Sequence, residues 1–227
     1  MARAQRALDE ARRSKAREGR RRKGTTMSPW DALSRPWQAA FAEAIAAYLR
    51  HGSAPIGAVV VDARGEIVAR GGNGASTNRL SHAEVNALAA IPTRIDRSKC
   101  EIYTTLEPCP MCTGAIRMSQ LRGVHFAAFD PSAGFTAYLQ ANEFMREFPC
   151  SSHPPTNIAL ELVIVSLVTE YRKRAGHDRW RERWTHYHPQ GAACGGSLAA
   201  SRAHAEWVAS SLTPEQLYDH LVSVGAP

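Results

Sequence analysis

The sequence predicts an α/β layered domain followed by a mostly helical C-terminal region. Between about residues 36 and 129, apolar residues recur with helical spacing in some segments and form short strand-like runs in others. After an opening helix, these segments follow the order β-β-α-β-α-β, so helices alternate with the later strands. The chain has 227 residues, which is enough for one ordinary domain with an appendage.

The opening helix is expected from about residue 36 to residue 50, because four large apolar residues lie on one face at i, i+4 spacing. Gly52 then ends it, since glycine is the usual residue just past a helix. Two β-rich runs, 56–61 and 66–70, predict a hairpin. Residues 71–74 (GGNG) are interpreted as a flexible connection.

The middle of the chain predicts two further helix–strand pairs. Ser81 is the expected N-cap of a helix over 82–90, and a β-branched and aromatic run predicts a strand over 101–105. A second helix is expected over 110–118, because proline suits its first turn. Residues 124–129 predict the next strand.

After about residue 135 the sequence patterns that predict secondary structure are weaker. Residues 136–148 favour a helix, and 158–168 fit either a buried strand or a buried helix, because a continuous apolar run does not distinguish them. Glycines over 191–196 are interpreted as a linker. Closing helices are expected over 198–211 and from Thr213 onward.

The net charge of +7 lies entirely in the first 26 residues, which carry ten basic and three acidic side chains. Residues 27–227 hold 18 basic and 18 acidic residues, so this part does not have the charge of a polyanion-binding protein. We therefore expect a solvated basic tail over 1–26, with a nucleic-acid or membrane-surface arm as the alternative. The expected domain division is 27–175 and 176–227.

Composition also narrows the location and the class of protein. No apolar run approaches the ~20 residues needed to cross a bilayer, and the N-terminus lacks the apolar segment of a secretory signal. We therefore expect a cytoplasmic protein without a membrane partner. In that setting the close pair Cys109 and Cys112 indicates a metal-binding or redox-active site rather than a disulfide framework.

Two short segments carry the candidate chemistry, SHAE over 81–84 and TLEPCPMC over 105–112. One imidazole and two thiolates form a borderline-soft donor set that suits zinc, and three protein ligands leave a fourth position open, as in catalytic sites. The candidate ligands are His82, Cys109 and Cys112. Glu84 is too close to His82 to be a comfortable second ligand, so it is expected beside the activated water as a general acid/base.

His-Ala-Glu followed by Pro-Cys-x-x-Cys resembles the zinc-dependent cytidine deaminase-like superfamily. The fuller strings SHAEVNAL over 81–88 and TLEPCPMCTGAI over 105–116 are more similar to tRNA adenosine deaminases and bacterial guanine deaminases than to free cytidine deaminases. PIGAVVV over 55–61 and Asn73 also match that group. The resemblance covers about residues 35–135.

The resemblance implies a three-layer α/β/α fold with a mixed central sheet and a helical C-terminal extension. It implies one zinc ion per chain, held by His82, Cys109 and Cys112, with Glu84 as the general acid/base of a hydrolytic deamination that releases ammonia. It further implies a homodimer. The substrate contacts that it implies come from four residues, Asn73, Ala83, Ile56 and Glu107.

Several alternatives stay open. The three ligands could form a structural zinc site or belong to a catalytically inactive binding subunit, and the cysteine pair could be redox-active, although no thioredoxin-like context accompanies it. A second metal site in the C-terminal region is less favoured than surface or packing roles, because the spacing of its candidates fits no ligand pattern. Those candidates are His177, His186, His188 and Cys194.

The substrate is predicted to be a small purine-like nucleobase or nucleoside. Residues 78–81 (NRLS) depart from the Asp-Pro-Thr that many relatives carry before the first motif, and ~90 residues follow position 135 where tRNA-acting relatives end in a short basic helix. A tRNA enzyme must neutralise several phosphates, and the neutral charge of 27–227 argues against that. A tRNA adenosine deaminase remains the alternative, because local clusters such as 171–174 and 179–183 could form a basic face.

Overall fold

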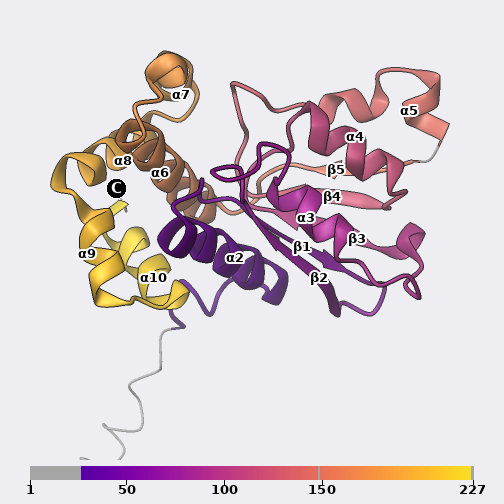
Figure 1. Ribbon diagram of the computed structural model, residues 1–227, viewed down its shortest axis with the longest axis horizontal. Coiled ribbons are helices and arrows are strands. Elements are labelled where there is room, and N and C mark those ends of the chain that lie inside the picture. Colours follow the sequence, from indigo (N-terminus) through magenta and orange to yellow (C-terminus); the bar gives the residue numbers. More distant parts are fainter. Residues whose placement is uncertain (1–26, 148, 226–227) are drawn as a thin grey trace, which may run out of the picture.

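The computed structural model describes residues 27–147 and 149–225 (Figure 1). The predicted tail over 1–26 lies outside the described residues. Within them, five strands form one mixed sheet in the order β2-β1-β3-β4-β5. β1 pairs antiparallel with β2 and β3, whereas β3, β4 and β5 run parallel. The strands are β1 (Gly57–Val61), β2 (Ile67–Gly72), β3 (Glu101–Thr104), β4 (Gly123–Phe126) and β5 (Ser151–His153).

Helices flank both faces of this sheet, which confirms the predicted layered architecture (Figure 1). The three helices are α2 (Arg35–His51), α3 (Ala83–Ala89) and α4 (Pro110–Met118). Side chains alternate between the faces along a strand, so Ala58 and Val60 of β1 join the core beneath α3 and α4. Val59 and Val61 join the core beneath α2.

Two glycines set how closely the helices approach the sheet. A Cβ atom on Gly57 would lie 2.2 Å from the carbonyl oxygen of Ala40 in α2. A Cβ atom on Gly71 would lie 2.3 Å from the carbonyl oxygen of Ala83 in α3. The interpretation of residues 71–74 as a flexible connection is therefore wrong for Gly71 and Gly72, which belong to β2. Glycine is present there because α3 packs directly on Gly71 and α2 packs on Gly72.

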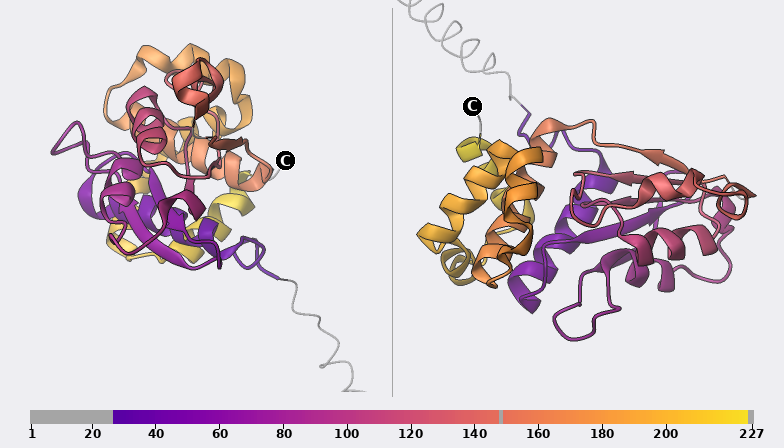
Figure 2. Two further views of the ribbon diagram at one scale, coloured as in Figure 1. Left: turned by 90° about the vertical axis from the view of Figure 1, so that its right-hand side faces the viewer. Right: turned by 90° about the horizontal axis from the view of Figure 1, so that it is seen from above.

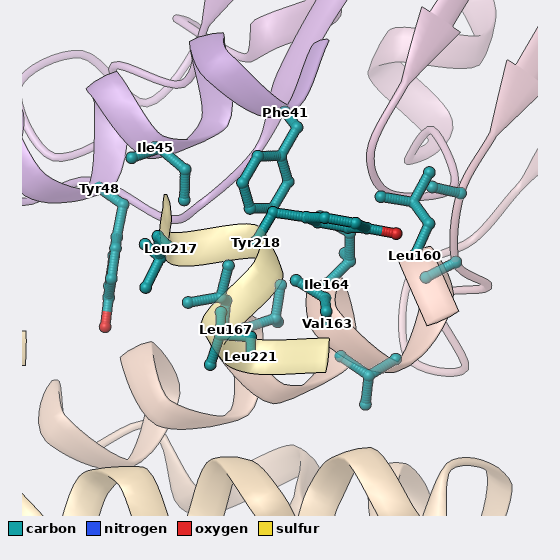
Figure 3. Close-up of a cluster of buried hydrophobic side chains, with 14 of the residues drawn as sticks. Phe41, Ile45, Tyr48, Leu160, Val163, Ile164, Leu167, Leu217, Tyr218 and Leu221 are labelled. Carbon is teal, nitrogen blue, oxygen red and sulfur yellow. The ribbon is translucent and has the colours of Figure 1, made fainter. Parts of the chain in front are cut away.

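The C-terminal helices gather beside α2 at one end of the sheet (Figures 1 and 2). They are α6 (Ile158–Arg174), α7 (Arg181–Tyr187), α8 (Pro189–Ser201), α9 (Ala203–Ser210) and α10 (Pro214–Gly225). Figure 3 shows the shared core, in which Phe41, Ile45 and Tyr48 of α2 face side chains of α6 and α10. The described residues therefore build a sheet half and a helical half on a common helix, α2.

Residues 158–168, which fit strand or helix in the sequence, form the start of α6. Asn157 caps this helix, because its side chain accepts a hydrogen bond of 2.9 Å from the backbone N–H of Leu160. The helix is buried on most sides, from Leu160 to Glu170, so it lacks the polar face that identifies a surface helix.

The predicted linker over 191–196 is wrong, since these glycines lie within α8. A Cβ atom on Gly195 would lie 2.3 Å from the carbonyl oxygen of Ser166 in α6, so the glycines serve close helix packing. The predicted helix over 198–211 is instead divided at Arg202, whose φ of 60° is left-handed. The predicted helix over 136–148 is likewise divided, into a 3₁₀ turn (Thr136–Gln140) and α5 (Glu143–Glu147).

Candidate functional site

The three predicted zinc ligands converge at the starts of α3 and α4. His82 is the N-cap residue of α3, Cys109 is the N-cap residue of α4, and Cys112 lies in the first turn of α4. The His82 Nδ1 atom is 3.6 Å from the Cys109 sulfur and 3.5 Å from the Cys112 sulfur, and the two sulfurs are 3.6 Å apart. Pro110 occupies the first helical position, where the N–H that proline lacks would have no partner within the helix. Proline therefore fixes the start of α4 between Cys109 and Cys112.

These distances fit a zinc ion. With Zn–S bonds of about 2.3 Å and Zn–N bonds of about 2.0 Å, a tetrahedral site has sulfur–sulfur and sulfur–nitrogen edges of about 3.5–3.8 Å. The three observed edges fall at 3.5–3.6 Å, so a single ion can contact all three atoms without moving the helices. Glu84 is the only other acidic or basic side chain with a polar contact to this trio among the described residues, and it contacts a ligand sulfur.

The two sulfurs have opposite tendencies to ionise. Hydrogen bonds from Cys112 and His82 lower the pKa of Cys109 to about 4. The hydrogen bond to Cys109 and burial raise the pKa of the Cys112 thiol. The hydrogen bond with Cys109 also raises the pKa of His82. Cys109 is therefore the thiol of this trio that ionises more readily, and metal binding favours loss of the protons that the other two groups tend to keep.

Glu84 lies directly behind the ligands, in the first turn of α3, and is buried. Its Oε2 atom is 3.4 Å from the Cys112 sulfur, and its Oε1 atom accepts a hydrogen bond of 3.2 Å from the Thr104 hydroxyl. Burial raises the pKa of this carboxyl group. A carboxyl with a raised pKa beside a metal site is suited to accept and return a proton near neutral pH.

The predicted substrate-contact residues lie in two places. Asn73 follows β2 and is buried, and its backbone N–H donates to the carbonyl of Ile56 at 2.9 Å. Its Oδ1 atom accepts from the N–H of Ala75 at 2.9 Å, which fixes the amide orientation. Ala83 is fully buried at the start of α3, between His82 and Glu84. Contact of these residues with a substrate stays a prediction.

The structure gives Glu107 a definite set of partners. Its Oε1 atom accepts hydrogen bonds from the Thr136 hydroxyl at 2.6 Å and from the Thr136 N–H at 3.2 Å, and its Oε2 atom accepts from the N–H of Asp130 at 3.4 Å. A Cβ atom on Gly134 would lie 2.0 Å from Oε2, so the loop closes tightly around the carboxylate. Glu107 therefore holds the loop over 130–136 against the metal motif.

Sequence reasoning missed the residues that support this site. Thr104 orients Glu84, and Thr136 with Gly134 surrounds Glu107. Position is the only feature of the sequence that could have indicated these residues. Thr104 ends the strand before the cysteine motif, and the loop over 130–136 follows the next strand. The candidates of the C-terminal region do not gather, since among the described residues none of His177, His186, His188 and Cys194 belongs to a metal-compatible cluster.

Residues 32–128 match the family described as the cytidine and deoxycytidylate deaminase zinc-binding region. This segment includes His82, Glu84, Cys109 and Cys112, together with strands β1 to β4 of the sheet. The chain contains a zinc-binding domain of the cytidine deaminase-like superfamily. The predicted superfamily and its zinc cofactor are thereby confirmed, while the role of each residue stays a prediction.

Relatives of this deaminase-family domain act on different substrates. The chain is 41% identical over 93 residues to a tRNA-specific adenosine deaminase of Bacillus subtilis, a match that covers 39% of this chain and 57% of the relative. It is 39% identical over 79 residues to a guanine deaminase of the same organism, covering 33% of this chain and 50% of the relative. The chain thus spans about half the length of these curated relatives.

A solved structure from work on A-to-I editing by tRNA:A34 deaminases is also similar, with 26% identity and a TM-score of 0.46. The similarity covers 52% of this chain and 95% of that chain. Over the residues that the structure describes, no helix of this deaminase-family chain combines the length and hydrophobicity needed to cross a bilayer.

Proposed function

We propose that this chain is a zinc-dependent hydrolytic deaminase that releases ammonia from the exocyclic amine of a purine-like nucleobase or nucleoside. The observation that carries the proposal is the pairing of a three-ligand cluster, with edges of 3.5–3.6 Å, and a buried carboxyl group 3.4 Å from one ligand. A purely structural zinc site has no need of such a carboxyl, and its four positions are usually all filled by protein ligands.

Each residue has a defined task in this proposal. His82, Cys109 and Cys112 hold the ion, which when bound supplies Lewis-acid activation of water. Glu84 takes a proton from the attacking water at its carboxylate and returns it to the ring nitrogen of the substrate. A second proton transfer converts the amine to ammonia, so water and the amine become a carbonyl group and ammonia.

Internal ion pairs favour a small substrate over tRNA. The basic residues over 171–174 would form a phosphate-binding surface only if they were unpaired, but two of the three cations pair with carboxylates. Arg172 lies 3.5 Å from the Asp130 carboxylate, and its side chain is only 21% exposed. Arg174 lies 3.0 Å from the buried carboxylate of Glu170. These cations are already neutralised, so they contribute little to binding a polyanion.

A tRNA adenosine deaminase is the second candidate, because a protein named as a tRNA-specific adenosine deaminase in Bacillus subtilis is 41% identical to this chain over 93 residues. A screen for ammonia release separates the two. The panel contains adenine, guanine, cytosine, their nucleosides and a tRNA anticodon arm. The small-molecule proposal expects turnover of a free base or nucleoside. Higher activity on the anticodon arm, falling steeply with added salt, would overturn it in favour of tRNA.

Glu84→Gln tests whether the chain is an enzyme. We expect ammonia release to fall about 10²–10⁴-fold, because general acid/base catalysis contributes that much, while the zinc content stays equal to that of the wild type. Glu206→Gln is the matched control, since Glu206 is exposed on α9. Ammonia release at background level from the wild type as well as from Glu84→Gln would show that the chain is a binding subunit, whereas equal measurable activity would show that Glu84 is not the general acid/base.

We also propose a cytoplasmic homodimer. Apolar side chains next to the metal helices support the dimer, because Leu80 before α3 is 65% exposed and Met118 at the end of α4 is 67% exposed. Light scattering on the purified chain tests it, with Leu80→Ser and Met118→Ser expected to shift the mass toward that of a monomer. A measured wild-type mass equal to that of a single chain would contradict the proposed dimer.

A further inference from the structure

A row of stacked rings crosses the sheet on the face that carries α2. Trp37 of α2 packs edge-on against Tyr103 of β3, with ring centroids 5.1 Å apart. Tyr103 stacks on His125 of β4 at 4.2 Å, and His125 stacks on His153 of β5 at 4.1 Å. This face is opposite to α3 and α4, so the row is separated from the predicted zinc ligands by the sheet itself.

Three metal-binding side chains meet at the outer end of this row. Strand register pairs His125 with His153 and places Glu101 on the same face, two residues before Tyr103. One donor atom from each of Glu101, His125 and His153 lies within 4.8 Å of the other two. The Glu101 Oε2 atom is 3.2 Å from the His125 Nε2 atom.

The surroundings orient these donors. Arg122 donates a hydrogen bond of 2.9 Å to the Oε1 atom of Glu101, which leaves Oε2 facing His125. The Ser151 hydroxyl lies 2.8 Å from the Nε2 atom of His153. The side chains of Glu101 and His125 are 21% and 20% exposed, so an ion can enter while much of the site is shielded from water.

We propose that Glu101, His125 and His153 bind a second divalent first-row transition-metal ion, independent of the cysteine-containing site. Two imidazoles and one carboxylate are a ligand set that zinc and its neighbours accept, with further positions left for water. The donors come from three adjacent strands, which are held in register by the ladder rather than by mobile loops. The His125 and His153 planes lie 8° apart, so one ring must turn out of the stack to bring both nitrogens to face one ion. The Glu101 carboxylate, held by Arg122 through Oε1, supplies Oε2 at the edge of the rings.

The ion would join three strands, including the short edge strand β5 (Ser151–His153). It would therefore also stabilise the connection from β4 to α6. This proposal is independent of the deaminase activity, because it uses none of the residues placed in that site.

Cobalt uptake by the full-length protein tests the second site. Dialysis against a weak chelator leaves one zinc ion per chain in the cysteine-containing site, and Co²⁺ is then added. We expect one further equivalent to bind and give visible d–d absorption without the near-ultraviolet band of a cobalt–thiolate bond. A thiolate band would show that Co²⁺ had only exchanged into the first site, and no uptake would show that the second site does not exist. Either result overturns the proposal.

Variants assign the ligands. His125→Gln and His153→Gln are expected to abolish the second equivalent, and Arg122→Ala is expected to weaken it about 10-fold or more, because outer-shell partners orient the ligands. Glu101→Gln keeps the ring stack and removes the anionic ligand, so it covers the case in which a histidine variant fails to fold. His220→Gln is the control, since His220 is exposed on α10. Full uptake by both Glu101→Gln and His153→Gln would overturn the assignment.

Discussion

The sheet half and the helical half of this protein hold their elements together in different ways. Where α3 crosses β2, the small residues Gly71, Ala83 and Ala87 let the helix backbone lie directly on the strand. The core shared by α2, α6 and α10 is filled by large rings, including those of Phe41 and Tyr218. Backbone contact leaves a helix few alternative positions, whereas interlocking side chains can repack. His82, one of the predicted metal ligands, lies at the start of α3, which is held by this backbone contact.

The helical half also contains a backbone contact, between α8 and α6 at Gly195. A pair of glycines, one from each half, therefore tests whether only the contact in the sheet half is coupled to the metal ligands. Gly71→Ala places a methyl group 2.3 Å from the backbone of α3, and Gly195→Ala places one 2.3 Å from the backbone of α6. Both should reduce the free energy of unfolding by about 3 kcal/mol or more, because neither contact can be relieved by turning a side chain. Only Gly71→Ala should also lower the zinc content, as measured by mass spectrometry, since α3 carries His82.

Gly114→Ala is the matched control, because a Cβ atom at this position in α4 meets nothing within 4 Å. It should stabilise the protein by up to about 1 kcal/mol, the usual advantage of alanine over glycine in a helix. If Gly195→Ala lost as much zinc as Gly71→Ala, packing in the helical half would affect the metal ligands as strongly as packing in the sheet half.

Tyr48→Phe tests how far the helical half depends on buried polar contacts. The Tyr48 hydroxyl donates to the carboxylate of Glu170, which is fully buried, and Arg174 donates to the other oxygen at 3.0 Å. We expect a loss of about 1–3 kcal/mol in the free energy of unfolding, because one oxygen of a buried carboxylate is left unpaired. Denaturant titration measures it. A loss below about 0.5 kcal/mol would show that water replaces the hydroxyl.

Alkaline pH should destabilise the helical half. Burial raises the pKa of Tyr48 above its ordinary value and raises the pKa of Tyr218 to about 12. A tyrosine with a raised folded-state pKa contributes stability that is complete below its unfolded pKa of about 10 and is lost as the pH rises beyond it. Melting temperatures from pH 8 to pH 11 should fall above about pH 10, and less so in Tyr48→Phe. Identical curves for the two proteins would contradict this assignment.

Arg172→Lys should have the smallest effect. Arg172 pairs with Asp130 at 3.5 Å and lies over the Trp184 ring at 4.4 Å, so it connects the two halves. Its Nη1 atom has no hydrogen-bond partner among the described residues, so lysine loses mainly the flat stacking surface. We expect a loss of about 1 kcal/mol in stability and a rise in KM with kcat nearly unchanged. A fall in kcat with KM unchanged would contradict this expectation, because it would mean that Arg172 affects the chemical step rather than substrate binding.

The zinc ligands could be predicted because they belong to two short motifs that resemble a known zinc-binding pattern, although His82 and Cys109 are 27 residues apart. Within each motif the functional residues are close together, with Glu84 two residues after His82 and Cys112 three residues after Cys109, each pair at the start of one helix. The cluster of Glu101, His125 and His153 could not be predicted, because its members lie 24 and 28 residues apart and meet only through strand register.

Composition also misled at the glycines. Glycine permits both a flexible linker and a close helix contact, and the sequence alone does not say which of these applies at Gly71 or Gly195. The helix that begins at Ile158 was ambiguous for another reason, since burial on most sides removes the periodic polar residues that distinguish a helix from a strand.

Glu107 lies two residues before Cys109, yet its carboxylate holds the loop over 130–136, and Asp130 of that loop pairs with Arg172 of α6. The wall beside the metal motif is thus fastened to the C-terminal helices, whereas the ligands are fastened to the sheet. Mutations in those helices are therefore expected to move the loop over 130–136 more than the three predicted ligands. The loop and the ligands can then change independently, because each is anchored to a different half of the protein.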